Sequence, residues 1–550
     1  MAEYDYIIVG GGIAGCVVAH RLKQYKPLSR ILVIEAGPDV SGNKDILLFS
    51  SLDFVGGKYD WGYKTVPQTH LDGRQIDVPS GRALGGGSVI NGCGWFRGSR
   101  ADYDSWAEMV QDNRWSYEGQ LPYFKKTEKW FHAQNPEEHG GQDGKMQIES
   151  PTSTGRLYPL AHITEQSWLE HGLRRLPFND MNAGTNHGLG ELNENRMGGA
   201  RQIGPLAYPL EGVTVMTDTL VREILLDGSS AVGVRLMNGD EILAEKEVIL
   251  AAGAYRTPQL LMLSGIGPAE TLSKHNIPVK LANPSIGQNF NDHAMMLLNW
   301  KLKDASQGYA LGSLNPLFAQ PEYSTGTPLS HVACTSIPSS LLKTAITQDE
   351  GEGNSPPPPD HYYLLKWDWA LMENLVMYLA TPPVPIKGGT HISTALMAMK
   401  PTSRGSVTLA SADPMDAPLL DPNYLATEVD RVVWRHSLRE IARLMTGDTT
   451  ALGRDFVAGE TPPEGFEPLT VDARDEDLDR RVRARCVSTF HGSGTCSMGN
   501  VVDTEVRVKG IDKLRIVDAS VFPISIGAHI QAAVYALAEQ AAVIIAGTED

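Results

Sequence analysis

Short apolar runs alternate with polar segments at the start of the chain. Residues 5–9 form an apolar run that predicts a buried strand, residues 13–22 predict a helix, and residues 31–34 predict a second buried strand. A strand, a helix and a second strand in this order are typical of a βαβ unit in a parallel sheet. The chain therefore begins as an α/β protein.

Glycines separate the first predicted strand from the helix, with the spacing Gly10-x-Gly12-x-x-Gly15. The first permits a tight turn, the second lets the backbone approach a pyrophosphate, and the third lets the helix pack closely on the strand. The helix N-terminus attracts phosphates, and Glu35, at the end of the second strand, is placed to accept a hydrogen bond from a ribose hydroxyl. Together these features predict a dinucleotide-binding site.

Later runs predict that this nucleotide-binding pattern is interrupted and then resumed. Residues 213–252 look like strands joined by hairpins, and a helix is expected to begin after Gly253. Residues 391–410 alternate as strands around a Ser-Arg-Gly turn, and residues 514–545 read as strand, loop and helix. Residues 348–360 are acidic and rich in proline, which predicts a solvated surface loop.

Composition excludes some classes of partner. The formal net charge of −17 argues against nucleic acid or an anionic membrane, and no apolar run reaches the length of a membrane span. The 5 cysteines are scattered without a CxxC pair, which predicts reduced thiols and no metal site. The first strand leaves no room for a signal peptide, and the sequence has no Asn-x-Ser/Thr acceptor, so we expect a cytoplasmic location; secretion of a processed form stays open.

Eight separated motifs follow one another along the chain. They are Gly10–Glu35, Gly81–Gly98, Gly253–Gly267, Ile286–His293, Ser403–Leu409, Asp421–Leu425, His491–Gly499 and Leu514–Gln540. Through them the chain resembles the glucose–methanol–choline (GMC) flavin oxidoreductases along nearly its whole length. The resemblance implies FAD as cofactor, an alcohol substrate, and a fold with a Rossmann-type FAD-binding domain and a second, α+β substrate domain.

The resemblance also implies how the chain divides. At 550 residues it is too long for one ordinary core. We expect the FAD-binding domain to be assembled from separated segments, residues 1–155, 212–293 and 485–550. Residues 156–211 and 294–484 would form the substrate-binding domain.

The family's cofactor site carries over to named positions. The residues expected to bind FAD are Gly10, Gly12, Ile13, Ala14, Gly15, Glu35, Ala36, Arg82, Gly86, Gly87, Ser88, Asn91, Gly92, Val221, Asp518, Ala519, Ile530 and Gln531. Some members attach FAD covalently through a histidine directly before the asparagine of the glycine-rich stretch. This chain has Ile90 there, so we expect FAD to be bound non-covalently.

Alcohol oxidation needs a base near the flavin and a polar group that holds the hydroxyl. A neutral imidazole can take the proton because its ordinary pKa lies close to working pH. His491 and His529 match the active-site pair of the family. We assign His491 as the base and His529 as the residue that orients the hydroxyl, and the opposite assignment stays open. The helix that follows His529 would stabilise negative charge on the flavin.

The motifs are most similar to those of aryl-alcohol oxidases, which favours a small primary alcohol, aromatic or otherwise unsaturated, oxidised to the aldehyde by hydride transfer to flavin N5. Those oxidases usually carry an aromatic gate directly after the position of Asn91, where this chain has Gly92. No segment is left over for a haem domain, which favours O2 as electron acceptor with H2O2 as product. A quinone acceptor, and a lyase or cyclase with non-redox flavin, remain alternatives, and the oligomeric state is open.

Overall fold

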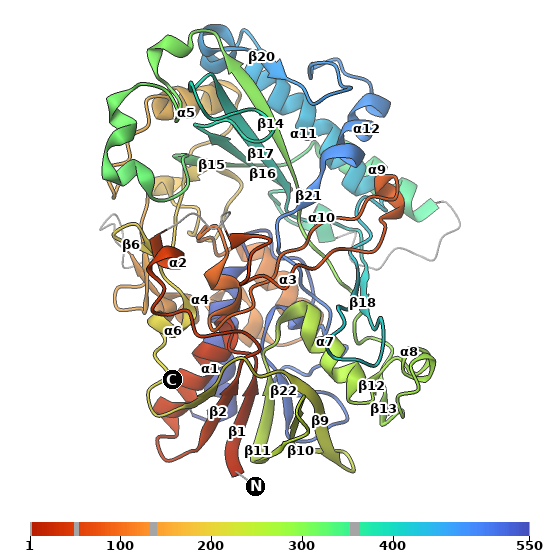
Figure 1. Ribbon diagram of the computed structural model, residues 1–550. Helices are drawn as coiled ribbons and strands as arrows, with labels where there is room; N and C mark the ends of the chain where they lie inside the picture. Colours follow the sequence, from red (N-terminus) through yellow and green to blue (C-terminus); the bar gives the residue numbers. More distant parts are fainter. Residues whose placement is uncertain (1–2, 49–53, 131–139, 352–362, 549–550) are drawn as a thin grey trace.

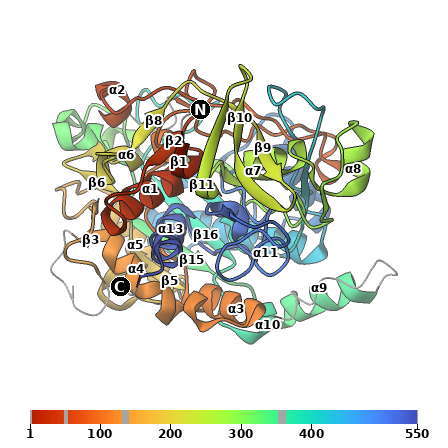
Figure 2. The ribbon, with the colours of Figure 1, turned by 90° about the horizontal axis from the view of Figure 1, so that it is seen from below.

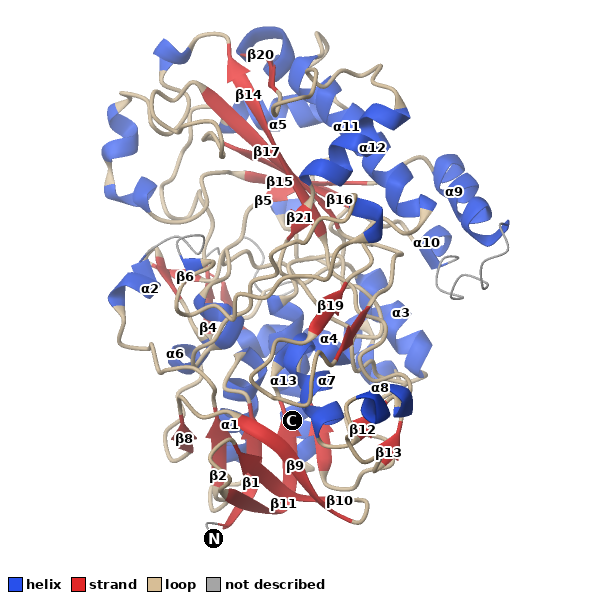
Figure 3. Ribbon diagram, turned by 45° about the vertical axis from the view of Figure 1, so that its right-hand side comes forward, coloured by secondary structure: helices blue, strands red, loops and turns tan. Residues whose placement is uncertain are grey.

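The computed structural model describes residues 3–48, 54–130, 140–351 and 363–548. Two seven-stranded sheets lie toward opposite ends of the molecule, with helices and loops between them (Figures 1 and 3). Within the described ranges, no helix is both long and apolar enough to cross a membrane.

The first sheet is the dinucleotide-binding type. Its strands are β1 (Glu3–Val9), β2 (Ile31–Ile34), β8 (Thr214–Met216), β9 (Val221–Asp227), β10 (Ser230–Leu236), β11 (Glu241–Leu250) and β22 (Leu514–Ile516). The order is β8-β2-β1-β11-β10-β9, with β22 beside β11. The pairs from β8 to β11 and the β11–β22 pair are parallel, whereas β10 is antiparallel to both neighbours. The carboxyl ends of β1 and β2 therefore meet at one edge, where such sheets bind ligands.

The hairpins predicted over residues 213–252 are confirmed only in part. β9, β10 and β11 form a meander, but β8 lies at the other edge of the sheet, against β2. β11 begins at Glu241, seven residues before its apolar end at residues 248–250. Its first residues alternate between exposed and buried and pair with β10, whereas its apolar end pairs with β1 and β22.

Two helices cover the first sheet and hold its segments together. α1 (Ile13–Tyr25) follows β1, and α13 (Gln531–Ala546) packs beside it, as Figure 2 shows. α13 is apolar around nearly its whole circumference and is buried accordingly. Arg21 of α1 forms an ion pair with the fully buried Glu539 of α13, with Nε 2.7 Å from Oε2. The strand, loop and helix predicted for residues 514–545 are confirmed.

The second sheet is antiparallel throughout. Its strands are β5 (Gly188–Glu191), β14 (Ala294–Leu302), β15 (His331–Thr335), β16 (Met372–Met377), β17 (His391–Ala398), β20 (Val457–Thr461) and β21 (Val487–Ser488). The order is β20-β14-β17-β16-β15-β5, with β21 beside β14. Alternate residues face opposite sides. Met295 and Met397 face a cavity described below, whereas Met296 and Leu396 join a core that includes residues of α11 (Glu428–Thr446).

Smaller elements complete the fold. The remaining helices are α2 (Lys44–Leu48), α3 (Arg100–Val110), α4 (Tyr117–Thr127), α5 (Ala161–Glu170), α6 (Gly204–Ala207), α7 (Gly253–Leu263), α8 (Ala269–Lys274), α9 (Ser339–Gly351), α10 (Tyr363–Lys366) and α12 (Asp475–Arg485). Short strand pairs are β3 (Glu128–Trp130) with β4 (Met146–Ile148), β6 (Arg196–Met197) with β7 (Ala200–Arg201), β12 (Ile266–Gly267) with β13 (Leu281–Ala282), and β18 (Ser406–Thr408) with β19 (Leu419–Asp421). α7 begins at Gly253, as predicted.

Two local predictions are wrong in part. The strands expected over residues 391–410 both form, but β17 and β18 belong to different sheets because the backbone between them bonds to other segments, such as Phe290 with Gly405. Residues 348–351 end α9 instead of forming a loop. Asp349 accepts hydrogen bonds from the first amides of α11, at 2.7 Å from Glu428 N, and this contact favours the helical end. Residues 352–360 of the predicted loop lie outside the described residues.

Candidate active site

A cavity of about 800 Å³ extends from the glycine turn after β1 to the second sheet. Of the residues expected to bind the cofactor, those in its wall are Gly10, Gly12, Ile13, Ala14, Glu35, Ala36, Gly86, Gly87, Asn91, Gly92, Val221, Asp518, Ala519, Ile530 and Gln531. His491 and His529 line the same cavity. Five of the separated motifs therefore meet around a single space, namely Gly10–Glu35, Gly81–Gly98, Gly253–Gly267, His491–Gly499 and Leu514–Gln540.

Gly15, Arg82 and Ser88 do not line this cavity, and they support its wall from behind. A Cβ on Gly15 would lie 2.0 Å from Gly10 O, so the glycine allows α1 to pack on the turn. Ser88 Oγ donates to Gly85 O at 2.6 Å and holds the glycine-rich loop. The Arg82 guanidinium lies 4.9 Å from the centre of the Trp61 ring, and Trp61 lines the cavity.

The end of the cavity near β1 fits a dinucleotide. A Cβ on Gly86 would lie 2.8 Å from Gly12 Cα, so two glycine turns bring bare backbone together at the wall. The buried Glu35 carboxylate accepts hydrogen bonds from Gly11 N and Gly37 N, both at 2.8 Å. Burial raises its pKa to about 7, although these bonds oppose the shift. Each carboxylate oxygen keeps a further lone pair, as a ribose diol requires.

His491 is held at the far end of the cavity by a strained loop that follows β21. The preceding residue, Phe490, has φ of 67°, a left-handed conformation that is costly for a bulky side chain. The buried Asp292 carboxylate accepts from His491 N at 2.8 Å, and Thr489 N donates to His293 O at 3.0 Å. These bonds tie the loop to the segment before β14 and fix the backbone of His491.

Hydrogen bonds also determine which nitrogen of His491 carries the proton. Thr489 Oγ1 donates its only proton to His293 O at 2.8 Å, so it accepts from His491 Nδ1 at 3.1 Å. His293 Nδ1, 2.9 Å from the same nitrogen, then also accepts, and His293 Nε2 donates to Ser525 Oγ at 2.8 Å. With Nδ1 of His491 protonated, its Nε2 keeps the lone pair that a base needs.

Both of these imidazoles are neutral at working pH. Burial, reinforced by His293 and His529, lowers the pKa of His491 well below its ordinary value. Burial, reinforced by the Lys400 ammonium and His529, lowers the pKa of His293 to about 3. A neutral His491 can accept a proton, whereas a cationic one cannot.

His529 has the opposite electrostatic character. Its Nε2 lies 2.8 Å from Oε1 of Glu373, a buried carboxylate on β16. Burial alone would lower the pKa of His529, but the charge and hydrogen bond of Glu373 more than offset this, so the pKa is raised above 6.5. The rings of His491 and His529 lie 5.1 Å apart between centroids, at 70°. The cavity thus places a neutral imidazole beside one that favours the cationic form.

Three residues of this site were not predicted from the sequence: Asp292, His293 and Glu373. Asp292 and His293 end the Ile286–His293 motif, but nothing in the sequence indicated that their side chains act on His491. Glu373 interrupts an otherwise mainly apolar strand, and a carboxylate in such a place is buried only when it has a partner. That signal was available in the sequence.

Comparison with known proteins agrees with the geometry. The GMC oxidoreductase family models match residues 4–295 and residues 401–538. The chain belongs to the GMC oxidoreductase family and is therefore an FAD-dependent flavoprotein oxidoreductase. Its resemblance to that family, and the expected Rossmann-type fold with a second sheet-containing part, are confirmed. The residue boundaries of the two domains stay a prediction.

Relatives are similar over their whole length. The chain is 39% identical over 549 residues to the GMC-type oxidoreductase acuG of Aspergillus aculeatus, covering 98% of each. It is 32% identical over 571 residues to an oxygen-dependent choline dehydrogenase of Pseudomonas fluorescens, covering 100% of this chain and 94% of the relative. A formate oxidase variant from Aspergillus oryzae RIB40 has a similar structure, with a TM-score of 0.84 and 27% identity over 99% and 98% of the two chains. The structure of pyridoxine 4-oxidase from Mesorbium loti is similar too, with a TM-score of 0.82 and 26% identity over 98% of each chain.

Proposed function

We propose that the protein oxidises a small primary alcohol, aromatic or otherwise unsaturated, to its aldehyde and passes the electrons to O2. The observation that carries this proposal is the pair of unlike imidazoles, His491 and His529, in the wall of one cavity. FAD, when bound, supplies the acceptor for the hydride that leaves the alcohol carbon. We expect it to be bound non-covalently, since the aliphatic Ile90 lines the cavity where some relatives have the linking histidine.

The wall that the second sheet contributes suits an apolar substrate body. Its lining side chains on β14, β16 and β17 are Met295, Leu297, Leu375, Met377, Ala395 and Met397. Such a surface binds an arene or alkene without a specific polar contact, and leaves the hydroxyl as the group that seeks a partner. The two imidazoles are the natural partners for it.

The imidazoles divide the work according to their protonation. Nε2 of His491 takes the hydroxyl proton, and its Nδ1 proton is held by Thr489 and His293. Glu373 favours the cationic form of His529, which stabilises the negative charge that develops on the alcohol oxygen. This arrangement supports His491 as the base and gives His529 an electrostatic role as well as an orienting one.

We propose O2 as the electron acceptor because of the charge near the flavin site. A cationic His529 would favour electron transfer to O2 by stabilising the anion that forms. Two of the relatives carry oxidase names, and one is called an oxygen-dependent choline dehydrogenase, which also links O2 to this fold. A quinone remains the second candidate acceptor.

The test is stoichiometric. Purified holoenzyme is mixed with benzyl alcohol or cinnamyl alcohol in air-saturated buffer, and aldehyde and peroxide are both measured. We expect one H2O2 per aldehyde. Reoxidation by O2 that is much slower than turnover with a quinone would make the protein a dehydrogenase. Flavin that no alcohol bleaches under anaerobic conditions would indicate a lyase or cyclase in which FAD does not change redox state.

A further inference from the structure

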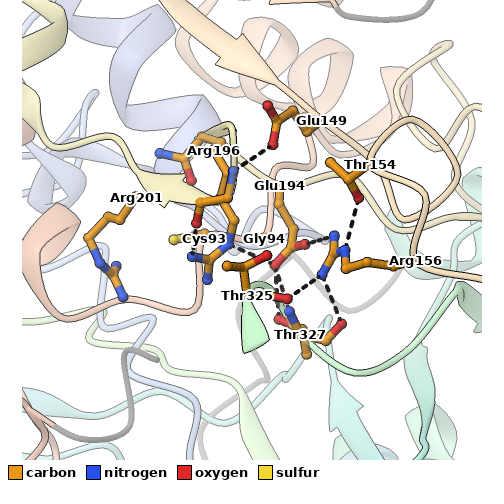
Figure 4. A network of polar contacts seen from close by, with 12 residues as sticks. Cys93, Gly94, Glu149, Thr154, Arg156, Glu194, Arg196, Arg201, Thr325 and Thr327 are labelled. Carbon is orange, nitrogen blue, oxygen red and sulfur yellow. Dashed lines mark hydrogen bonds and ion pairs between the residues drawn. The ribbon is translucent and has the colours of Figure 1, made fainter. Parts of the chain in front are cut away.

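A buried cluster of charged side chains adjoins the cavity beside Gly94 (Figure 4). We call it the arginine cluster, and its members are Glu149, Arg156, Glu194, Arg196 and Arg201. All of them are at most 4% exposed. The cluster has three guanidinium groups and two carboxylates, so it leaves an excess of positive charge that is almost entirely shielded from solvent. Buried charge of this kind is costly unless a counter-charge accompanies it.

One arginine of the cluster is fully engaged. Arg156 donates from Nη2 to Glu194 Oε2 at 2.5 Å, from Nη1 to Thr325 O at 3.0 Å, and from Nε to Thr154 Oγ1 at 2.9 Å. These contacts use every nitrogen of the guanidinium. Arg156 therefore holds the loop around Thr325 in place and has no free edge for a ligand.

The other two arginines each keep an unused nitrogen. Arg196 donates from Nε to Glu194 Oε1 at 3.2 Å and from Nη1 to Gly199 O at 3.2 Å. Its Nη2 has no hydrogen-bond partner among the residues that the structure describes. Nη2 of Arg201 is buried and likewise unpartnered within the described chain, and no carboxylate there forms an ion pair with this side chain. Burial, with a further contribution from Arg196, lowers the pKa of Arg201.

Arg196 is the member that reaches the cavity. It lines the same space as His491 and His529, whereas Arg201 lies behind Asn91 and donates to the carbonyl of that residue at 2.6 Å. Gly94 and Glu194 link the backbone of Arg196 to the surroundings of His529. A Cβ on Gly94 would lie 3.1 Å from His529 Nδ1, and Gly94 pairs with Glu194, two residues before Arg196.

Apolar side chains form the wall that the second sheet contributes, and two arginines, Arg196 and Arg256, line the rest of the cavity. Arg256 donates from Nη1 to Gln259 Oε1 at 2.6 Å and to Pro414 O at 3.0 Å, whereas Arg196 belongs to the cluster with excess positive charge. We propose that Arg196 binds an anionic group of the substrate and that the preferred substrates are alcohols that also carry a carboxylate. A carboxylate meets a guanidinium through charge-assisted hydrogen bonds, and it would supply the counter-charge that the cluster lacks. The inference deepens the proposed function and rests on it, because it names the substrate class of the same site.

A titration of wild-type holoenzyme tests the proposal without turnover. Benzoate and benzamide have nearly the same shape and differ in charge, and each is added while the visible absorbance of the flavin is followed. We expect benzoate to bind about 10- to 100-fold more tightly, since a hydrogen bond to a charged group is strong and benzamide lacks the charge. Equal affinity of the two ligands would overturn the proposal.

Substitutions then locate the effect. R196M is expected to abolish the preference for benzoate, and R196K to retain part of it. The matched control is R156M, which removes an equally buried arginine with no free edge; it should lower thermal stability and leave the ligand preference unchanged. A preference for benzoate that survived in R196M would refute the role of Arg196.

Turnover separates this inference from the proposed function. Wild-type kcat/KM for 4-(hydroxymethyl)benzoate should exceed that for benzyl alcohol, and R196M should reverse this order. If R196M instead weakened FAD retention and slowed both alcohols equally, the guanidinium would serve the cofactor and the proposal would be wrong. If neither alcohol reduced the flavin while benzoate still bound preferentially, the proposed function would fail and the anion site would stand.

Discussion

Replacing Glu373 by glutamine removes the charge that raises the pKa of His529 while preserving the shape of the side chain. In the wild type, Oε1 of Glu373 lies 2.8 Å from His529 Nε2, and its side chain is 2% exposed. The carboxylate is the cause of the raised pKa of His529, because burial acts in the opposite direction. In E373Q burial is left without opposition, and the pKa of His529 falls below 6.5.

The expected loss of rate follows from that change. Removing one preorganised electrostatic group from an active site typically slows the chemical step by about 10²–10³-fold. E373Q should therefore reduce the rate of flavin reduction by up to this order at neutral pH, because the lowered pKa of His529 disfavours its cationic form there. In the wild type the rate should decline as pH rises through the raised pKa of His529, and in E373Q this decline should move to lower pH.

The substitution should also lower the stability of the fold, in a way that depends on pH. The folded pKa of His529 lies above its unfolded value, so the ion pair stabilises the fold fully below about pH 6.5 and ceases to do so as pH rises through the folded pKa. Breaking a buried pair typically costs about 3–5 kcal/mol. The difference in free energy of unfolding between wild type and E373Q should thus be largest below about pH 6.5 and smaller above the raised pKa of His529.

The assay is anaerobic stopped-flow reduction with benzyl alcohol across pH, alongside thermal unfolding of both proteins. E460Q is the matched control, because Glu460 is an equally buried carboxylate whose Oε1 lies 2.6 Å from Arg481 Nη1, and it does not line the cavity. It should lose stability and keep the wild-type pH profile. An E373Q enzyme with an unchanged reduction rate and an unchanged pH profile would refute the electrostatic role assigned to the pair.

Three further outcomes are expected. Acid or heat denaturation should release free FAD, because Ile90 offers no linking nitrogen; yellow colour that stays with the precipitate would contradict this. E35A should weaken FAD binding by about 10- to 100-fold, since one charge-assisted hydrogen bond is lost, and an unchanged dissociation constant would remove Glu35 from the ribose role. H293Q should flatten the loss of stability below pH 6.5, measured by thermal unfolding, because the unfolded chain protonates His293 there and the fold does not; an unchanged slope would mean that His293 titrates normally.

Local patterns predicted the nucleotide-binding half of the fold well. β1, α1 and β2 form where the apolar runs and the Gly10-x-Gly12-x-x-Gly15 spacing placed them, and Glu35 lies in the cavity wall. These features depend on residues close together in the chain, so a periodic pattern is enough to reveal them. The long-range pairing of β8 with β2 has no local signal and was assigned to the wrong neighbour.

The candidate site shows the same limit more sharply. The sequence identified His491 and His529 through motifs but could not reveal their protonation. That depends on Glu373 and His293, which reach the imidazoles only after distant segments have folded together. Likewise, Asp349 lies in an acidic segment that we predicted to be a loop. In the structure it belongs to the end of α9, where it contacts the start of α11. Burial and partners decide a pKa, and neither can be read from spacing alone.

Alcohol oxidation by this protein requires His491 to remove the hydroxyl proton, and flavin reduction in active-site variants measures that step. Wild type, H491A and H529N are each mixed anaerobically with benzyl alcohol or its α-dideuterated form, and flavin reduction is followed by absorbance. The account predicts a primary isotope effect in the wild type, a loss of about 10²–10⁴-fold in H491A with the FAD spectrum intact, and a milder loss in H529N. An H491A enzyme that reduced its flavin as fast as H529N or faster would contradict the assignment of His491 as the base.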